Sequence, residues 1–264
     1  MLKIRNEKES DYRIVEEITR KAFYNVYVPR CMEHYLVHVM REHEDFVPEL
    51  DFVVELDGQV IGNIMYTKSK LTDEVGMEKE ILTFGPVSIL PEYQRNGYGK
   101  MLIEHSMKRA AELGYEAIVI MGSPANYVSC GFQCCKKYNV CVEGGKYPAA
   151  MLVKELKPGT FDGRKWYYSE SPAMIIDERE AQAFDDSLEK MEKKWMPSQE
   201  AFYIMSNSFV EWAESGCYCS GQLTREQENS GKPRKIGLSK TFDSLKMSGK
   251  QRCKGCLIDS ASPK

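Results

Sequence analysis

The residues best suited to chemistry lie in the segment 94–100, where the sequence reads QRNGYGK. An apolar run over residues 81–90 precedes this segment, and apolar residues at helical spacing over 100–113 follow it. The first backbone N–H groups of a helix have no partner inside the helix, and the helix dipole adds partial positive charge there. A buried strand, a glycine loop and a helix in this order predict an anion-binding site.

The side chains of the loop fit a phosphate ligand. Gly97 and Gly99 leave room for a phosphate against the backbone, while Arg95 and Lys100 add positive charge. The dinucleotide fingerprint GxGxxG does not fit, because its third glycine would stand where the sequence has Leu102. The P-loop motif does not fit either, since no Gly-Lys-Ser/Thr follows. A phosphate-bearing ligand other than these common nucleotide types is indicated.

The segment resembles motif A of the GNAT superfamily of N-acyltransferases, Gln/Arg-x-x-Gly-x-Gly/Ala after a strand rich in Val and Ile. Here the motif is Gln94-x-x-Gly97-x-Gly99. The resemblance covers about residues 1–157, and it implies that the loop binds the pyrophosphate of acetyl-coenzyme A (acetyl-CoA). The cofactor-binding positions that it implies here are Val87, Ser88, Ile89, Gln94, Arg95, Asn96, Gly97, Tyr98, Gly99 and Lys100.

A second motif, residues 123–132, strengthens the resemblance. In GNAT proteins a short helix at this place carries an Asn that bonds the pantetheine arm, which is Asn126 here. A Tyr four residues before a Gly-Phe pair often protonates the departing thiolate, and Tyr127 precedes Gly131 and Phe132 in this way. The alternative for Tyr127 is a core tyrosine with a satisfied hydroxyl, but the pair and its spacing favour the catalytic role.

The resemblance implies direct transfer, in which a neutral amine attacks the thioester carbonyl and coenzyme A leaves. The interruption of the central strand at Gly85 and Pro86 fits this reaction, because it frees backbone groups for the pantetheine and the oxyanion. An acceptor that arrives as an ammonium must first lose a proton. Glu80 is one possible base, but a solvated strand-end Glu is the favoured interpretation, so the general base stays unassigned.

Histidines and cysteines raise two other possibilities, metal binding and an acyl-cysteine intermediate. The histidines lack a metal-ligand partner in sequence, so a solvated or partly packed helix face is favoured for them. Three clustered cysteines could suggest an acyl-cysteine intermediate, but no His lies near them in sequence, and core or surface thiols are favoured. These residues are His34, His38 and His43, and Cys130, Cys134 and Cys135.

The elements around the motifs predict a mixed α+β chain with the GNAT fold, in which helices flank a central, mostly antiparallel, twisted sheet. Asp57 and Gly58 between two alternating segments predict a hairpin, and residues 68–79 read as a polar connection. Further strands are expected over 2–5, 51–56, 59–66, 116–121, 140–143 and 149–156, and helices over 11–23 and 29–42.

Composition divides the chain into three parts. Residues 1–157 form the predicted GNAT domain, and 158–214 a packed, mainly helical extension with helices over 177–194 and 198–214. Residues 215–264 are polar and read as a weakly ordered tail flanked by cysteines. Two close pairs of cysteines in this tail could bind zinc. One pair is Cys-x-Cys, however, whereas structural zinc sites usually have two to four residues between paired ligands, so we expect no metal. The cysteines concerned are Cys217, Cys219, Cys253 and Cys256.

The whole composition limits the partners. A formal net charge of −3 over 264 residues argues against a general nucleic-acid binder, and no apolar run reaches membrane-spanning length. No signal peptide is evident, and nine cysteines, an odd number with an adjacent pair, favour reduced thiols. We therefore expect a cytoplasmic protein, monomer or homodimer, whose partners are acetyl-CoA and a small-molecule or peptide amine, without nucleic acid or membrane.

Three hypotheses follow from the sequence. The favoured one is an acetyl-CoA-dependent N-acetyltransferase acting on a primary amine. The second is a regulatory module that binds acyl-CoA without turnover, which the intact motif residues argue against. The third gives the acetyltransferase a zinc-bound tail that recruits a partner protein.

Overall fold

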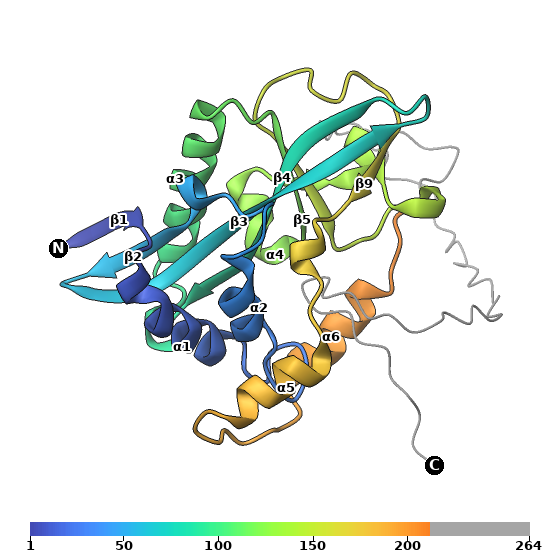
Figure 1. The fold of residues 1–264 in the computed structure, drawn as a ribbon. Helices are drawn as coiled ribbons and strands as arrows, with labels where there is room; N and C mark the ends of the chain where they lie inside the picture. The colour runs from blue at the N-terminus through green and yellow to red at the C-terminus, as the bar shows by residue number, and fades with distance from the viewer. Residues whose placement is uncertain (212–264) are drawn as a thin grey trace, which may run out of the picture. The chain divides into compact units, whose positions relative to one another are not determined.

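The computed structural model describes residues 1–211 (Figure 1). The strands are β1 Leu2–Asn6, β2 Phe52–Leu56, β3 Gln59–Asp73, β4 Glu78–Ile89, β5 Ala117–Met121, β6 Gln133–Cys134, β7 Val140–Cys141, β8 Met151–Glu155 and β9 Trp166–Ser169. The helices are α1 Tyr12–Phe23, α2 Glu33–Met40, α3 Tyr98–Glu112, α4 Pro124–Tyr127, α5 Glu178–Asp186 and α6 Pro197–Ser206. The tail predicted over 215–264, with its four cysteines, lies outside the described residues.

All of these strands belong to one sheet, in the order β1-β2-β3-β4-β5-β8-β6, with β9 beside β3 and β7 beside β9. The pairs are antiparallel except β4 with β5 and β7 with β9. The predicted mixed α/β fold with a mostly antiparallel sheet is confirmed. The parallel strands β4 and β5 share a single registered pair, Leu82 with Ile118, so their carboxyl ends are not joined by the ladder.

The hairpin predicted at Asp57 and Gly58 is confirmed, and both residues have positive φ, 51° and 88°. The polar connection predicted over 68–79 is wrong. Instead, β3 runs on to Asp73 and pairs with a β4 that begins at Glu78. Leu71 is fully buried, and β9 pairs with this part of β3, so tertiary pairing outweighs the polar composition of the segment.

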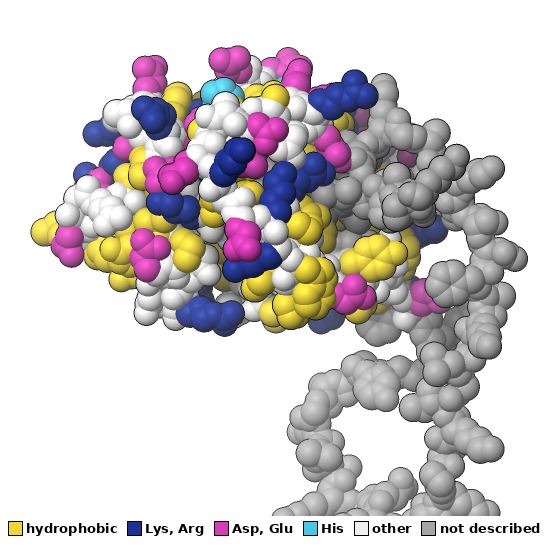
Figure 2. Space-filling view, turned by 90° about the horizontal axis from the view of Figure 1, so that it is seen from below, with side chains coloured by type: hydrophobic (Ala, Val, Ile, Leu, Met, Phe, Trp, Pro, Cys, Tyr) yellow, Lys and Arg dark blue, Asp and Glu magenta, His cyan; other side chains and the backbone are white. Residues whose placement is uncertain are grey.

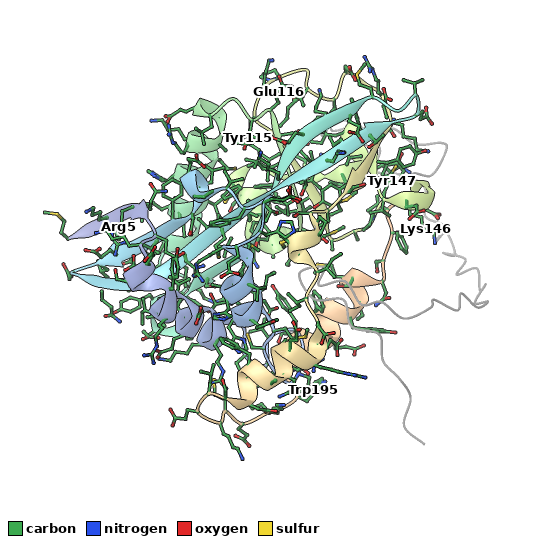
Figure 3. All side chains as sticks on the ribbon, viewed as in Figure 1. Arg5, Tyr115, Glu116, Lys146, Tyr147 and Trp195 are labelled. Carbon is green, nitrogen blue, oxygen red and sulfur yellow. The ribbon has the colours of Figure 1, made fainter. Side chains whose placement is uncertain are left out.

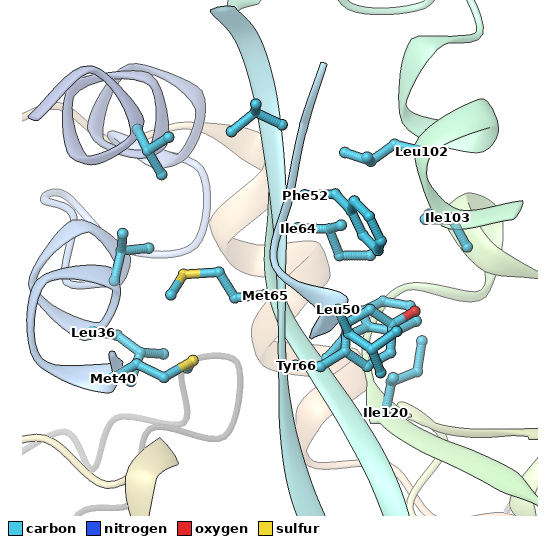
Figure 4. Close-up of a cluster of buried hydrophobic side chains, with 14 of the residues drawn as sticks. Leu36, Met40, Leu50, Phe52, Ile64, Met65, Tyr66, Leu102, Ile103 and Ile120 are labelled. Atoms are coloured by element: carbon cyan, nitrogen blue, oxygen red, sulfur yellow. The ribbon is translucent and has the colours of Figure 1, made fainter. Parts of the chain in front are cut away.

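The core lies on both faces of the sheet, as Figure 4 shows. Successive residues of a strand point to opposite faces, so Met65 packs with Leu36 and Met40 of α2, while Ile64 and Tyr66 lie on the side of α3 (Figure 4). The helices α1 and α2 thus cover one face, and α3 covers the other.

The two helices of the extension are shorter than the sequence predicts. The first of its helices ends at Asp186, because carbonyls of the following loop accept hydrogen bonds from α1 and its end: Glu189 O from Arg20 at 2.8 Å and Met191 O from Tyr24 at 3.0 Å. The second ends at Ser206, where the chain turns to bond residues 147–149.

Side chains anchor this extension on α1 and α2. The guanidinium of Arg20 donates to the Asp185 carboxylate at 2.8 Å, and both side chains are buried. The amide of Gln199, at the start of α6, donates to the carbonyl of Asn25 at 3.0 Å. Segments near the two ends of the described chain are therefore joined in space.

Figure 2 shows the molecule from the side of α5 and α6, with hydrophobic side chains between charged ones. Exposed examples are Trp195, Met196, Tyr203 and Ile204. Within residues 1–211 no helix has the length and apolar character needed to cross a membrane.

Candidate active site

The loop before α3 has the geometry of an anion site. Helix α3 starts at Tyr98, and Gly97 caps it in the left-handed region with φ 86°. The Gln94 side chain donates to the Ile89 carbonyl at 2.9 Å, and the Asn96 side chain donates to the Tyr93 carbonyl at 3.2 Å. The motif glutamine thus ties the loop to the end of β4.

The charge around this helix end favours an anion. No acidic residue lies in the first turn of α3, where a carboxylate would compete for the free N–H groups. Arg95 is exposed beside it, and Lys100 lies 3.7 Å from Glu104, an exposed pair that gives little energy. A side chain at Gly99 would approach Ile89 at 3.6 Å, so the loop packs closely on the strand.

A bulge interrupts the pairing of β3 with β4. Ile64 pairs with Val87 and Tyr66 with Phe84, so one residue of β3 opposes Gly85 and Pro86 of β4. The predicted break of the central strand is confirmed, and it lies where β4 is no longer registered with β5.

A cavity of about 60 Å³ opens at this bulge. Residues 83–87 of β4 form one wall, and Met121, Gly122 and Ser123 at the carboxyl end of β5 lie beside it. Tyr115 and Glu116, labelled in Figure 3, mark the opposite, amino end of β5. The remaining walls come from α1, α2, Tyr127 and the extension.

Tyr127 lies at the end of α4 with a half-buried ring. The ring centroid is 5.8 Å from that of Phe84 and 6.0 Å from that of Phe132. Within residues 1–211 its hydroxyl makes no hydrogen bond, unlike that of the buried Tyr66, which bonds Ser106 at 2.8 Å. Burial raises the pKa of Tyr127 to about 12, so the hydroxyl keeps its proton at neutral pH.

Gly122 makes room for this ring. A Cβ at position 122 would lie 2.5 Å from Cε2 of Tyr127, which is closer than atoms can approach. We expect Gly122→Ala to displace the tyrosine ring and lower turnover about tenfold or more, since misplaced catalytic groups lose rate steeply. A turnover assay beside a thermal melt checks this. A folded variant with unchanged turnover would contradict the packing argument.

The remaining sequence-predicted residues differ in placement. Val87 lines the cavity, and Asn126 is exposed on α4. The hydroxyl of Ser88 is buried and donates to Thr19 of α1 at 3.0 Å. A contact of Ser88 with a cofactor would therefore involve its backbone.

Sequence reasoning missed most of the cavity wall, including Glu33, Glu170, Phe202 and Met205. The last three lie far beyond the motifs, in the extension, and no local spacing signals them. Glu80, the base considered from the sequence, is exposed, lies 3.8 Å from Lys68 and does not line the cavity.

The family model described as Acetyltransferase (GNAT) family matches residues 17–132. These residues form a GNAT acetyltransferase domain. The uncharacterized N-acetyltransferase YjhQ of Escherichia coli strain K12 is 26% identical over 149 residues, 56% of this chain and 75% of the relative. YhbS of the same strain is 25% identical over 128 residues, 48% of this chain and 74% of the relative.

Solved structures share the fold. The Escherichia coli YhbS structure in complex with CoA has a TM-score of 0.56 at 22% identity, covering 65% of this chain and 91% of that one. A GNAT acetyltransferase of Brucella melitensis in complex with acetyl-CoA has a TM-score of 0.52 at 24% identity, covering 66% and 97%. The GNAT fold and the class of acyltransferase are thereby supported from sequence and structure.

The histidines and cysteines of the GNAT domain lie outside the cavity lining. His34 is fully buried, 3.4 Å from Asp185, with its ring 5.3 Å from that of Phe184, while His38 bonds Glu16 at 2.9 Å. The described cysteines are free thiols, and burial raises the pKa of Cys130 and Cys135. Packing roles account for these side chains. Within the described part of the chain, no group of three or more potential metal ligands is found.

Buried His34 predicts an acid-sensitive fold. Burial lowers its pKa to about 4, against about 6.5 in an unfolded chain. The unfolded state therefore binds more protons between these values, so stability present above pH 6.5 is lost as the pH falls towards 4. The difference amounts to at most about 3 kcal/mol. Chemical denaturation at pH 7 and pH 5 checks this. We expect His34→Phe to reduce the loss.

Proposed function

We propose that this acetyltransferase moves the acetyl group of acetyl-CoA directly to a primary amine. One observation carries the proposal: the bulge of β4 and Tyr127 face the same cavity, and the same strand leads to the anion loop. Val87 lines the cavity, and Ile89, two residues or about 7 Å further along, contacts the loop. Acetyl-CoA would thus lie along one strand, with its thioester at the bulge and its phosphates at the start of α3.

The proposed chemistry balances as follows. The amine nitrogen forms a bond to the thioester carbonyl carbon, and backbone N–H groups at the bulge stabilise the oxyanion. The carbon–sulfur bond then breaks, and the thiolate takes the proton of the Tyr127 hydroxyl. The attacking nitrogen loses its second proton as it becomes an amide nitrogen, and a proton returned from this nitrogen or from solvent restores the Tyr127 hydroxyl. The ammonium proton lost before attack passes to solvent or to a carboxylate of the cavity. The products are the N-acetyl amine and free coenzyme A.

The residues at the loop fit acetyl-CoA. Its pyrophosphate would accept bonds from the N–H groups of α3 after Gly97, and Arg95 and Lys100 would add charge. CoA or acetyl-CoA bound in the two structural neighbours supports this assignment. We propose that residues 1–157 hold the cofactor and catalyse transfer, while the extension, over residues 158–210, packs on them and completes the cavity.

A thiol-release assay over a panel of amines, with acetyl-CoA as donor, tests the proposal. We expect release of coenzyme A that depends on both the amine and the protein, with the N-acetyl product found by mass spectrometry. Tight binding of acetyl-CoA without release over the panel would instead favour the regulatory module.

A further inference from the structure

We propose that the acceptor is a primary amine on an apolar body with no carboxylate beside the amine, held as an ammonium between Glu33 and Glu170. This inference rests on the proposed acetyl transfer and adds the substrate class. It is carried by the charges and the apolar wall of the cavity at the bulge.

The charged side chains of the cavity have one sign. Among the lining residues of the part of the chain that the structure describes, Glu33 and Glu170 are charged, and none is Lys, Arg or His. Glu33 is 5% exposed, so its carboxylate lies where water screens charge weakly. It is held in place by the Met32 N–H, which donates to Oε2 at 3.0 Å. A cation is therefore attracted to the cavity.

The same charges exclude one common class of amine. An α-amino acid would bring its own carboxylate within a few ångströms of its nitrogen. Among the lining residues within 1–211 there is no cationic side chain to pair with that carboxylate, and the two glutamates would repel it. Amines without the carboxylate, or with the carboxyl group in an amide, avoid this cost.

The uncharged part of the cavity is apolar and aromatic. The ring of Tyr27 lies 5.7 Å from that of Phe23 and 4.5 Å from that of Phe202. Leu36 and Met205 lie in the same lining. This wall fits a branched aliphatic or phenyl group. Among the described lining residues there is no third carboxylate that could hold a second ammonium of a polyamine.

The extension supplies three of the residues on which this argument depends. Glu170 follows β9, and Phe202 and Met205 lie three residues apart, on one face of α6. All three lie beyond the family-matched residues 17–132. Acceptor choice would therefore belong to the part of the chain that is held by Arg20 of α1 and by Asn25, which follows α1.

Matched acceptors test the proposal. The kcat/KM of each acceptor is measured with acetyl-CoA as donor. One set is phenylalanine, its primary amide and 2-phenylethylamine, and the other is leucine, leucinamide and 3-methylbutylamine. We expect the amines and amides to exceed the amino acids by at least about 100-fold, since an unpaired, repelled carboxylate costs several kcal/mol. Acetylation of the amides would indicate that peptide N-termini are acceptors, and acetylation of the amines would indicate small-molecule acceptors. Activity in either arm supports the proposal.

Variants connect the selectivity to the cavity. We expect Glu170→Gln to raise KM for 2-phenylethylamine about tenfold or more and to reduce the preference over phenylalanine. Glu33→Gln provides a second test if the first variant fails to fold. Phe202→Ala should raise KM for the phenyl substrate, whereas Tyr203→Ala and Glu200→Gln, exposed on the same helix, should change neither value.

Preference for the amino acids or for spermidine would overturn this inference, as would an unchanged preference in both glutamate variants. Absence of acetylation of every one of these amines and amides, while other amines are acetylated, would also overturn it. Failure of acetyl-CoA to raise the melting temperature would instead refute the proposed function itself. The thermal shift, measured without acceptor, keeps the two failures apart.

Discussion

Replacing Gly97 by valine is expected to abolish the stabilisation of this protein by acetyl-CoA. Ligand at about a hundred times its dissociation constant adds about 2.7 kcal/mol to the folded state. For a chain of this size that corresponds to a melting shift of roughly 5–10 °C. Gly97 has φ 86°, and a β-branched side chain both disfavours this conformation and fills the space that a phosphate would occupy. Thermal melts with and without acetyl-CoA measure the effect.

The opposite end of the same helix offers a matched control. Gly114 follows α3 with φ 92°, and a Cβ there, as at Gly97, would meet no atom within 4 Å. Gly114→Val should therefore carry a similar backbone cost, about 1–2 kcal/mol, and still show the full acetyl-CoA shift. Equal shifts in the two variants would refute the assignment of the phosphate site to the loop before α3.

Much of the fold could be predicted from local sequence, because local chemistry determines it. Asp57 and Gly58 adopt the positive φ angles of a tight hairpin, as the residue types predict. The loop over 94–100 likewise follows from its glycines and from the strand and helix beside it. Where a segment depends on distant partners, prediction failed. Leu71 lies in a long strand because β4 and β9 pair with β3.

The residues of the cavity likewise divide into those that local sequence predicts and those that depend on distant contacts. Gly85, Pro86 and Tyr127 stand in motifs whose spacing is visible in the chain, and the structure brings them to one cavity. Glu170 and Phe202 have no such signal, since their positions depend on the contacts that dock the extension. The two glutamates and the apolar wall of the cavity are therefore placed by tertiary structure, whereas the loop over 94–100 is determined by local sequence.

Replacing Tyr127 by phenylalanine should lower kcat about 100-fold, at the lower end of the range for a general acid, because a thiolate is already a fair leaving group. The ring and its contacts with Phe84 and Phe132 remain, so stability and the acetyl-CoA shift should change little. With its pKa raised to about 12, the wild-type hydroxyl stays protonated throughout an assay from pH 6 to 10. The kcat of the variant should therefore be lower by the same factor at every pH in that range.

A second tyrosine separates the loss of this hydroxyl from a general effect of Tyr→Phe. Tyr138 is also partly buried, with a pKa raised by burial, but its ring packs on Phe161, 4.9 Å away, and it does not line the cavity. Tyr138→Phe should leave kcat unchanged. If Tyr127→Phe also leaves kcat unchanged while chemistry limits the rate, Tyr127 only packs, and solvent must protonate the thiolate. If both variants lose activity together, the loss reflects the fold. Only a loss confined to Tyr127 places the leaving-group proton on its hydroxyl.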